Sequence, residues 1–155
     1  RRSFRYRKTY LMFTKVAIAS DHAGYDLKHY ILNNLDKNIN VNDFGTDSND
    51  SCDFPDFASK VCEYILKNQD YRGILICGSG VGMSIAANKF VGIRAANVSN
   101  KENAIQSVEH NNVNVLSLGS SNVDNDSAMD IIAAFLAASF SKEDRYLRRI
   151  NKLAN

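Results

Sequence analysis

Residues 73–77 form an apolar run, Gly-Ile-Leu-Ile-Cys, that leads directly into a glycine-rich segment. A strand without polar side chains is typical of the centre of a parallel sheet, where helices cover both faces. Segments with the periodicity of strands and of helices alternate on both sides of this run. This alternation predicts an α/β protein in which right-handed crossovers connect parallel strands.

Five strands and six helices can be placed from these patterns. The predicted strands are 15–20, 39–44, 73–77, 92–98 and 113–118, and the predicted helices are 23–37, 55–66, 83–89, 99–109, 126–140 and 142–153. Pro55 favours a helix start, and Ser99 is the expected N-cap of the fourth helix. We therefore predict a three-layer α/β/α Rossmann-like fold with a five-stranded parallel sheet.

Charge divides the chain into two parts. Residues 1–15 contain six basic residues and no acid, whereas the remaining 140 residues contain 13 basic and 17 acidic residues. We interpret residues 1–14 as a basic arm and residues 15–155 as a single, mildly acidic domain, and we predict no nucleic-acid binding. The arm is expected to be a disordered tail or sequence upstream of a natural start at Met12; a transit-peptide fragment is the third alternative.

Composition limits the compartment and the cofactors. No apolar run approaches the roughly 20 residues of a membrane-spanning helix. The three cysteines, Cys52, Cys62 and Cys77, are odd in number and lack CxxC spacing. This favours a reducing compartment such as the cytoplasm over a disulfide framework or a zinc site. The histidines lack the spacing of metal ligands, so we expect no metal.

Reactive side chains lie next to three strand ends. Asp21 and His22 follow the first strand, the loop Gly78–Gly82 follows the third, and His110 and Asn111 precede the fifth. Ligands of open parallel sheets bind beyond the carboxyl ends of the strands. Glycines between a strand and a helix allow backbone N–H groups to approach an anion. The spacing matches neither the dinucleotide fingerprint nor the Walker loop, which argues against a nicotinamide oxidoreductase.

Each of these residues also has a purely structural interpretation. Cys77 is either a small buried residue or, beside the loop amides, a stabilised thiolate that acts as a general base or nucleophile. Asp21 suits a helix N-cap, and His110 suits a core histidine. Arg145 and Arg149 lie four residues apart on the last helix, so they either share a phosphate or form a solvated basic face.

Taken together, several segments resemble the type B ribose-5-phosphate isomerase family, which includes the galactose-6-phosphate isomerase subunits. The resemblance covers residues 15–153, and its most specific part is ICGSGVGMSIAANK at 76–89. The other matching segments are SDHAGYDLK at 20–28, DFPDFA at 53–58, EHNNVNVLSLG at 109–119 and RYLRRI at 145–150.

The resemblance implies a cofactor-free aldose–ketose isomerase that interconverts ribose 5-phosphate and ribulose 5-phosphate in the pentose phosphate pathway. Cys77 would be the base, Ser79 and the loop would hold the enediolate, and His110 with Asp21 would open the sugar ring. The implied contacts to sugar and phosphate are His22, Gly78, Gly80, Val81, Gly82, Asn111, Arg145 and Arg149. The family also implies a homodimer or tetramer with sites shared between subunits, with the last helix packed on the partner.

The sequence departs from the family at three positions. Ser121 and Val108 stand where family members often have arginine, and Phe54 stands where they often have tyrosine. Loss of a phosphate-binding arginine weakens binding, because a charge-assisted hydrogen bond contributes about 1.5–3 kcal/mol. Two alternatives therefore remain: an isomerase of a six-carbon sugar phosphate such as allose or galactose 6-phosphate, or a catalytically weak sugar-phosphate-binding protein.

Overall fold

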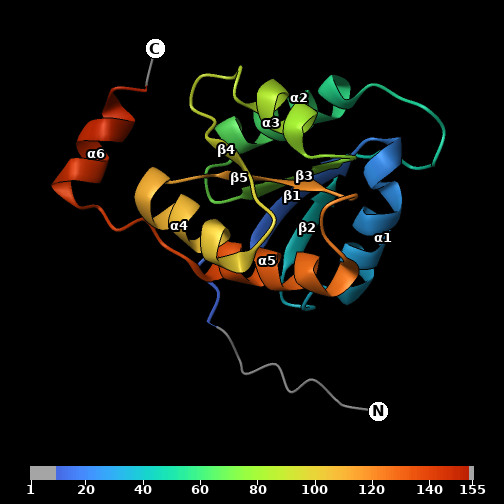
Figure 1. The fold of residues 1–155 in the computed structure, drawn as a ribbon, viewed down its shortest axis with the longest axis horizontal. Helices are drawn as coiled ribbons and strands as arrows, with labels where there is room; N and C mark the ends of the chain where they lie inside the picture. The colour runs from blue at the N-terminus through green and yellow to red at the C-terminus, as the bar shows by residue number, and fades with distance from the viewer. Residues whose placement is uncertain (1–9, 154–155) are drawn as a thin grey trace.

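A computed structural model describes residues 10–153 and places five parallel strands in one sheet with helices on both faces (Figure 1). The strands are β1 (Lys15–Ser20), β2 (Asn40–Asp43), β3 (Arg72–Cys77), β4 (Ala95–Asn97) and β5 (Val115–Gly119). The helices are η1 (His22–Gly24), α1 (Tyr25–Asn34), α2 (Phe54–Lys67), α3 (Val81–Ala87), α4 (Lys101–Asn111), α5 (Asn125–Ala137) and α6 (Asp144–Asn151). The predicted α/β Rossmann-like fold is confirmed.

The strands lie in the order β2-β1-β3-β5-β4, so β3 occupies the centre of the sheet. In register, Ile74 pairs with Ile18 of β1 on one side and with Leu116 of β5 on the other. Residues 73–77 of β3 are all buried, which confirms the central position predicted from their apolar sequence. All pairings are parallel, so the carboxyl ends of the strands meet at one edge of the sheet.

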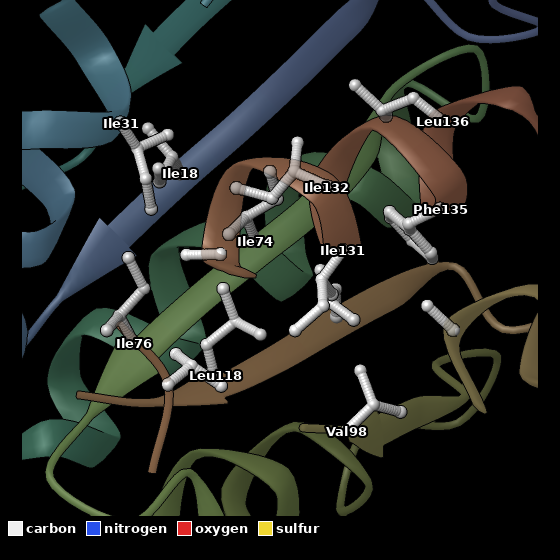
Figure 2. Close-up of a cluster of buried hydrophobic side chains, with 14 of the residues drawn as sticks. Ile18, Ile31, Ile74, Ile76, Val98, Leu118, Ile131, Ile132, Phe135 and Leu136 are labelled. Atoms are coloured by element: carbon white, nitrogen blue, oxygen red, sulfur yellow. The ribbon is translucent and has the colours of Figure 1, made fainter. Parts of the chain in front are cut away.

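The two faces of the sheet carry separate cores. Ile74 and Ile76 of β3 face α1 and α5, where Ile31, Ile131 and Phe135 pack against the sheet (Figure 2). Leu75 and Cys77 alternate with them and belong to the core beneath α2 and α3. Figure 1 shows the corresponding layers, with α1, α4 and α5 on one face and α2 and α3 on the other. This two-sided burial explains why β3 lacks polar side chains.

Several predicted boundaries are wrong for local reasons. Asn100, rather than Ser99, caps α4, because its side chain accepts a hydrogen bond from the N–H of Asn103, three residues on. The first long helix ends at Asn34 instead of residue 37, since Leu35 is already extended. The fourth strand starts at Ala95 instead of residue 92. At this start, the Asn88 side chain bonds to both the N–H and the carbonyl of Ala95.

Both ends of the described chain contact the fold. The N–H groups of Met12 and Phe13, which lie in the predicted arm, donate to the Leu136 carbonyl at 3.0 and 3.1 Å. Residues 1–9 of that arm are outside the described residues. Helix α6 lies beside α4 at the outer edge of the molecule and covers a shorter range than the predicted 142–153 (Figure 1). Within residues 10–153, no helix has the length and apolar character to cross a membrane.

Candidate active site

The first candidate residues lie where β1 ends beside β3. The N–H of Asp21 donates to the Ile76 carbonyl at 3.1 Å, and the Asp21 carboxylate accepts from the N–H of Gly24 at 3.1 Å. The N-cap interpretation of Asp21 is therefore confirmed for the short helix η1. The same cap holds η1 against β3, so a buried carboxylate and His22 lie next to the segment that contains Cys77.

Cys77 is the last residue of β3 and is buried, and the loop after it folds back over its sulfur. The N–H of Gly80 donates to Cys77 Sγ at 3.2 Å. A donor at this position favours negative charge on sulfur, as a general base requires. Gly80 has φ of +79°, a left-handed conformation that suits glycine, so the sequence of the loop permits this contact.

Three side chains, from β4, from β5 and from the turn after β5, fix the glycine loop. Asn97 and Asn122 each donate from Nδ2 to the Ser79 carbonyl at 3.2 Å, and Ser117 Oγ donates to the Gly80 carbonyl at 2.6 Å. With these carbonyls held, the loop presents N–H groups on its other side. The amides of Gly82 and Met83 find no acceptor within residues 10–153. Such preorganised donors suit an anionic ligand or intermediate.

His22 is oriented by a loop that sequence reasoning did not connect to it. The N–H of Cys52 donates to His22 Nδ1 at 3.2 Å, and Cys52 Sγ lies 3.8 Å from the same nitrogen. An acceptor at Nδ1 places the proton of the neutral ring on Nε2, which then becomes the donor available to a ligand. The loop is anchored by buried Lys28, whose Nζ contacts the Asp43 carboxylate and the Thr46 carbonyl, both at 2.7 Å.

A second group of candidate residues lies on α4 and α6. The His110 ring stacks on Tyr146 with centroids 4.4 Å apart and an interplanar angle of 15°. The Arg145 guanidinium lies over the same Tyr146 ring, with its carbon 4.6 Å from the centroid, and it pairs with Glu143 at 3.1 Å. Asn111 and Arg149 are exposed. Arg145 and His110 thus both lie against Tyr146, a residue that the sequence analysis did not single out.

The structure does not bring the two groups together within one chain. Cys77 pairs with Gly119 at the carboxyl end of β5, whereas α4 ends with His110 and Asn111 ahead of the amino end of that strand. The four residue steps of β5 alone separate these edges by about 13 Å, at roughly 3.3 Å per residue. A helix that leads into a parallel strand must end at its amino edge, and this rule was available from the sequence.

Cys62, the remaining cysteine, lies in the core, and the described residues hold no group of three metal ligands. Cys62 is fully buried on the inner face of α2, and burial raises the pKa of its thiol to about 12. It is therefore a core residue, as its position on the helix predicts. In the part of the chain that the structure describes, no three His, Cys, Asp or Glu side chains gather as ligands for a metal ion.

Comparisons with known proteins identify the family. The family model described as Ribose/Galactose Isomerase matches residues 16–153. Ribose-5-phosphate isomerase B of Escherichia coli is 41% identical over 140 residues, which cover 90% of this chain and 93% of that protein. Solved structures of ribose-5-phosphate isomerase B from Clostridium thermocellum and of the Thermotoga maritima enzyme superpose with TM-scores of 0.86 and 0.88, at 48% and 45% identity. The matched regions cover 90% and 91% of this chain, and 94% and 97% of the chains in those two structures.

These matches confirm the resemblance drawn from the sequence, and they confirm the expectation that the chain is an isomerase. The match of the family model extends from β1 to the end of α6, so it includes both groups of candidate residues. The identity is high enough, over enough of each chain, to assign the relationship without reference to any single motif. The chain belongs to the Ribose/Galactose Isomerase family.

Proposed function

We propose that this protein interconverts ribose 5-phosphate and ribulose 5-phosphate, with Cys77 as the base. The observation that carries the proposal is the hydrogen bond from the Gly80 amide to the Cys77 sulfur, at the base of a loop with unused N–H donors. The relatives that act on ribose 5-phosphate, by their names, match this chain over nine-tenths of its length.

The reaction moves one proton from C2 to C1 and one proton from the C2 oxygen to the C1 oxygen, with no net oxidation or reduction of the sugar. The Cys77 thiolate takes the proton from C2 of the open-chain aldose, and the electron pair moves to give a C1–C2 enediolate. Cys77 then delivers that proton to C1, while the C2 hydroxyl loses its proton to become the ketone and the C1 oxygen gains a proton to become a hydroxyl. Because negative charge develops on the sugar oxygens, the amides of Gly82 and Met83, with the Ser79 hydroxyl, stabilise the intermediate more than the substrate.

The second group of residues would complete the site from another subunit. His110, proposed to open the furanose ring together with Asp21, lies at the opposite edge of the sheet from Cys77 in the same chain. A homodimer that places α4 and α6 of one subunit over the Cys77 loop of the other would unite them. In that arrangement Asn111 would contact the sugar, and His22, Arg145 and Arg149 would bind the phosphate.

The test is conversion of ribose 5-phosphate to ribulose 5-phosphate with a chelator present throughout. We expect turnover in the full chain. In Cys77→Ala we expect kcat to fall by at least about a thousandfold, because the catalytic base is removed. Cys62→Ala is the matched control, because that thiol is fully buried on α2 and is not one of the candidate residues. It should retain turnover close to that of the original protein.

Near-normal turnover in Cys77→Ala would remove Cys77 as the base while leaving the substrate assignment intact. Absence of turnover in the folded, unmodified protein would overturn the ribose 5-phosphate proposal. Assays with allose 6-phosphate and galactose 6-phosphate would then separate a six-carbon isomerase from a sugar-phosphate-binding protein. Circular dichroism of each variant shows whether a loss of rate reflects a loss of fold.

A further inference from the structure

A polar cavity lies at the amino edge of the sheet, away from the Cys77 loop. It has a volume of about 300 Å³. Its polar lining comes from Gln69, Arg72, Arg94, Asn112 and Asn114. Arg72 is the first residue of β3, and Arg94 directly precedes β4, so both guanidinium groups enter from strand starts. Neither Arg145 nor Arg149 contributes to this cavity.

Neither arginine has a carboxylate partner within residues 10–153. Arg72 Nη1 donates to the carbonyls of Gln69 and Tyr71 at 3.5 and 3.3 Å. Arg94 donates from Nε to the Asn112 carbonyl at 2.7 Å and from Nη1 to the Gly92 carbonyl at 3.3 Å. A guanidinium has five N–H donors, so each arginine keeps donors that no protein group accepts.

The local charge is unbalanced as a result. Asp70, the nearest acid in sequence to Arg72, is already paired with Lys15 at 2.7 Å. One face of Arg72 is covered by the Phe13 ring, 3.5 Å from the guanidinium carbon to the ring centroid. Burial lowers the pKa of Arg72 to about 10, with a smaller contribution from the Arg94 charge, and burial also lowers the pKa of Arg94. Both remain cationic at neutral pH and repel each other.

The amide side chains around the cavity add further donors. Asn114 is used internally, since its Oδ1 accepts from the Arg94 N–H and its Nδ2 donates to the Gly92 carbonyl. This pair of bonds fixes the backbone of Arg94 beside the cavity. The side-chain amides of Gln69 and Asn112 form no hydrogen bond within the described residues, although both face the same cavity. The lining is therefore rich in donors and holds two uncompensated charges.

We propose that this cavity is a binding site for a small phosphate-bearing anion, separate from the site at Cys77. Two forked guanidinium groups match the oxygens of a phosphate monoester, and a dianion neutralises both charges. The cavity has room for more than the phosphate group, so a phosphorylated metabolite with a short carbon chain fits it. The site does not depend on the proposed isomerase reaction, because none of its lining residues takes part in that reaction.

The test uses inorganic phosphate as the probe and the full chain at constant ionic strength. Arginine Nε–H signals are followed by ¹H–¹⁵N NMR during a phosphate titration, with chloride as the ionic-strength control. We expect saturable shifts of the Arg72 and Arg94 signals in the unmodified protein and also in Arg149→Gln. Arg72→Gln should weaken phosphate binding at Arg94 by about tenfold or more, the effect of losing one charge-assisted contact.

Arg72→Lys keeps the charge without the fork, and it serves as the second variant if Arg72→Gln does not fold. An affinity between those of the unmodified protein and Arg72→Gln would support the geometry. Absence of saturable shifts at both arginines, or an unchanged affinity in both Arg72 variants, would overturn the proposal. Turnover of ribose 5-phosphate is measured on the same samples, so failure of the isomerase proposal and failure of the anion site are distinguished.

Discussion

Gly80 allows the loop after β3 to turn back over Cys77. Its φ is +79°, and a Cβ at this position would collide with Asn97 Oδ1 and approach the Gly119 nitrogen to 3.0 Å. Gly80→Ala should therefore destabilise the fold by about 1–3 kcal/mol and displace the amide that bonds to sulfur. Gly78→Ala is the matched control, since its Cβ would meet only the Ala23 Cβ at an ordinary 3.7 Å.

Urea unfolding of the two glycine variants, together with isomerase turnover, measures both effects. Equal stability of Gly80→Ala and Gly78→Ala would contradict the strain assigned to Gly80. A stable Gly80→Ala protein with full turnover would show that the amide–sulfur bond is dispensable for the reaction. The two glycines lie two residues apart in one loop, so a difference in the stability of their variants reports on local geometry.

The residues of this site differ in how far the sequence could identify them. Cys77 and the loop Gly78–Gly82 are contiguous, and their position after an apolar strand is a local pattern. Asn97 and Asn122 act on the Ser79 carbonyl across 18 and 43 residues, so their role depends on strand order. A single asparagine after a strand carries no local signal, and the order of the strands becomes known only from the fold.

At the scale of elements, the loop from Gly45 to Asp53 is held by one buried cation. The Lys28 side chain is only 2% exposed, and its Nζ bonds to both the Asp43 carboxylate and the Thr46 carbonyl. Lys28→Met should destabilise the protein by about 1–3 kcal/mol, because two acceptors lose their donor. It should also free the loop that places the Cys52 amide on His22.

Lys15→Met is the matched control for this prediction. Lys15 makes an equally short ion pair with Asp70, but both side chains are largely exposed, so its loss should change stability little. Chemical denaturation gives the two stability changes, and the ¹⁵N shifts of the His22 ring show whether its Nε2–H tautomer persists. Similar stability changes in both variants, with an unaltered His22 spectrum, would contradict a tethering role for Lys28.

Elements were easier to predict than their ends. The strand at residues 73–77 and the helix that begins near Pro55 follow from periodicity, which extends over many residues. The shift of the α4 cap from Ser99 to Asn100 reflects one hydrogen bond to Asn103. The late start of β4 reflects the Asn88 side chain, which forms hydrogen bonds with the backbone N–H and carbonyl of Ala95. A pattern that averages over many residues does not predict single hydrogen bonds of this kind.

At the scale of the whole molecule, the candidate residues fall into two groups within one chain, which we propose to be the two halves of a site shared between subunits. The half with Asp21, His22 and Cys77 lies at the carboxyl edge of the sheet, and the half with His110 and Arg149 lies on α4 and α6. The sequence predicted the parallel sheet and both sets of residues. Their separation also follows from the chain order, because Cys77 ends β3 and His110 precedes β5, which places them at opposite edges of a parallel sheet.

The proposal of sites shared between subunits leads to a prediction about mixtures of subunits. Cys77→Ala and His110→Gln should each abolish turnover alone, because every site in either homodimer lacks one group. After mild dissociation and random reassociation of equal amounts, half of the dimers are mixed. Each mixed dimer contains one site with both original residues and one site with neither. Turnover should therefore recover to about a quarter of that of the unmodified protein, by the statistics of a two-fold symmetric dimer.

The mixture distinguishes shared from separate sites because the alternative gives a different result. If Cys77 and His110 of the same chain served one site, every site in the mixture would lack one of them, and turnover would stay at the level of the single variants. Mixing Cys77→Ala with Cys77→Ser controls for reassociation, since neither supplies an intact base. Recovery in the first mixture alone would place α4 and α6 of one subunit over the Cys77 loop of the other.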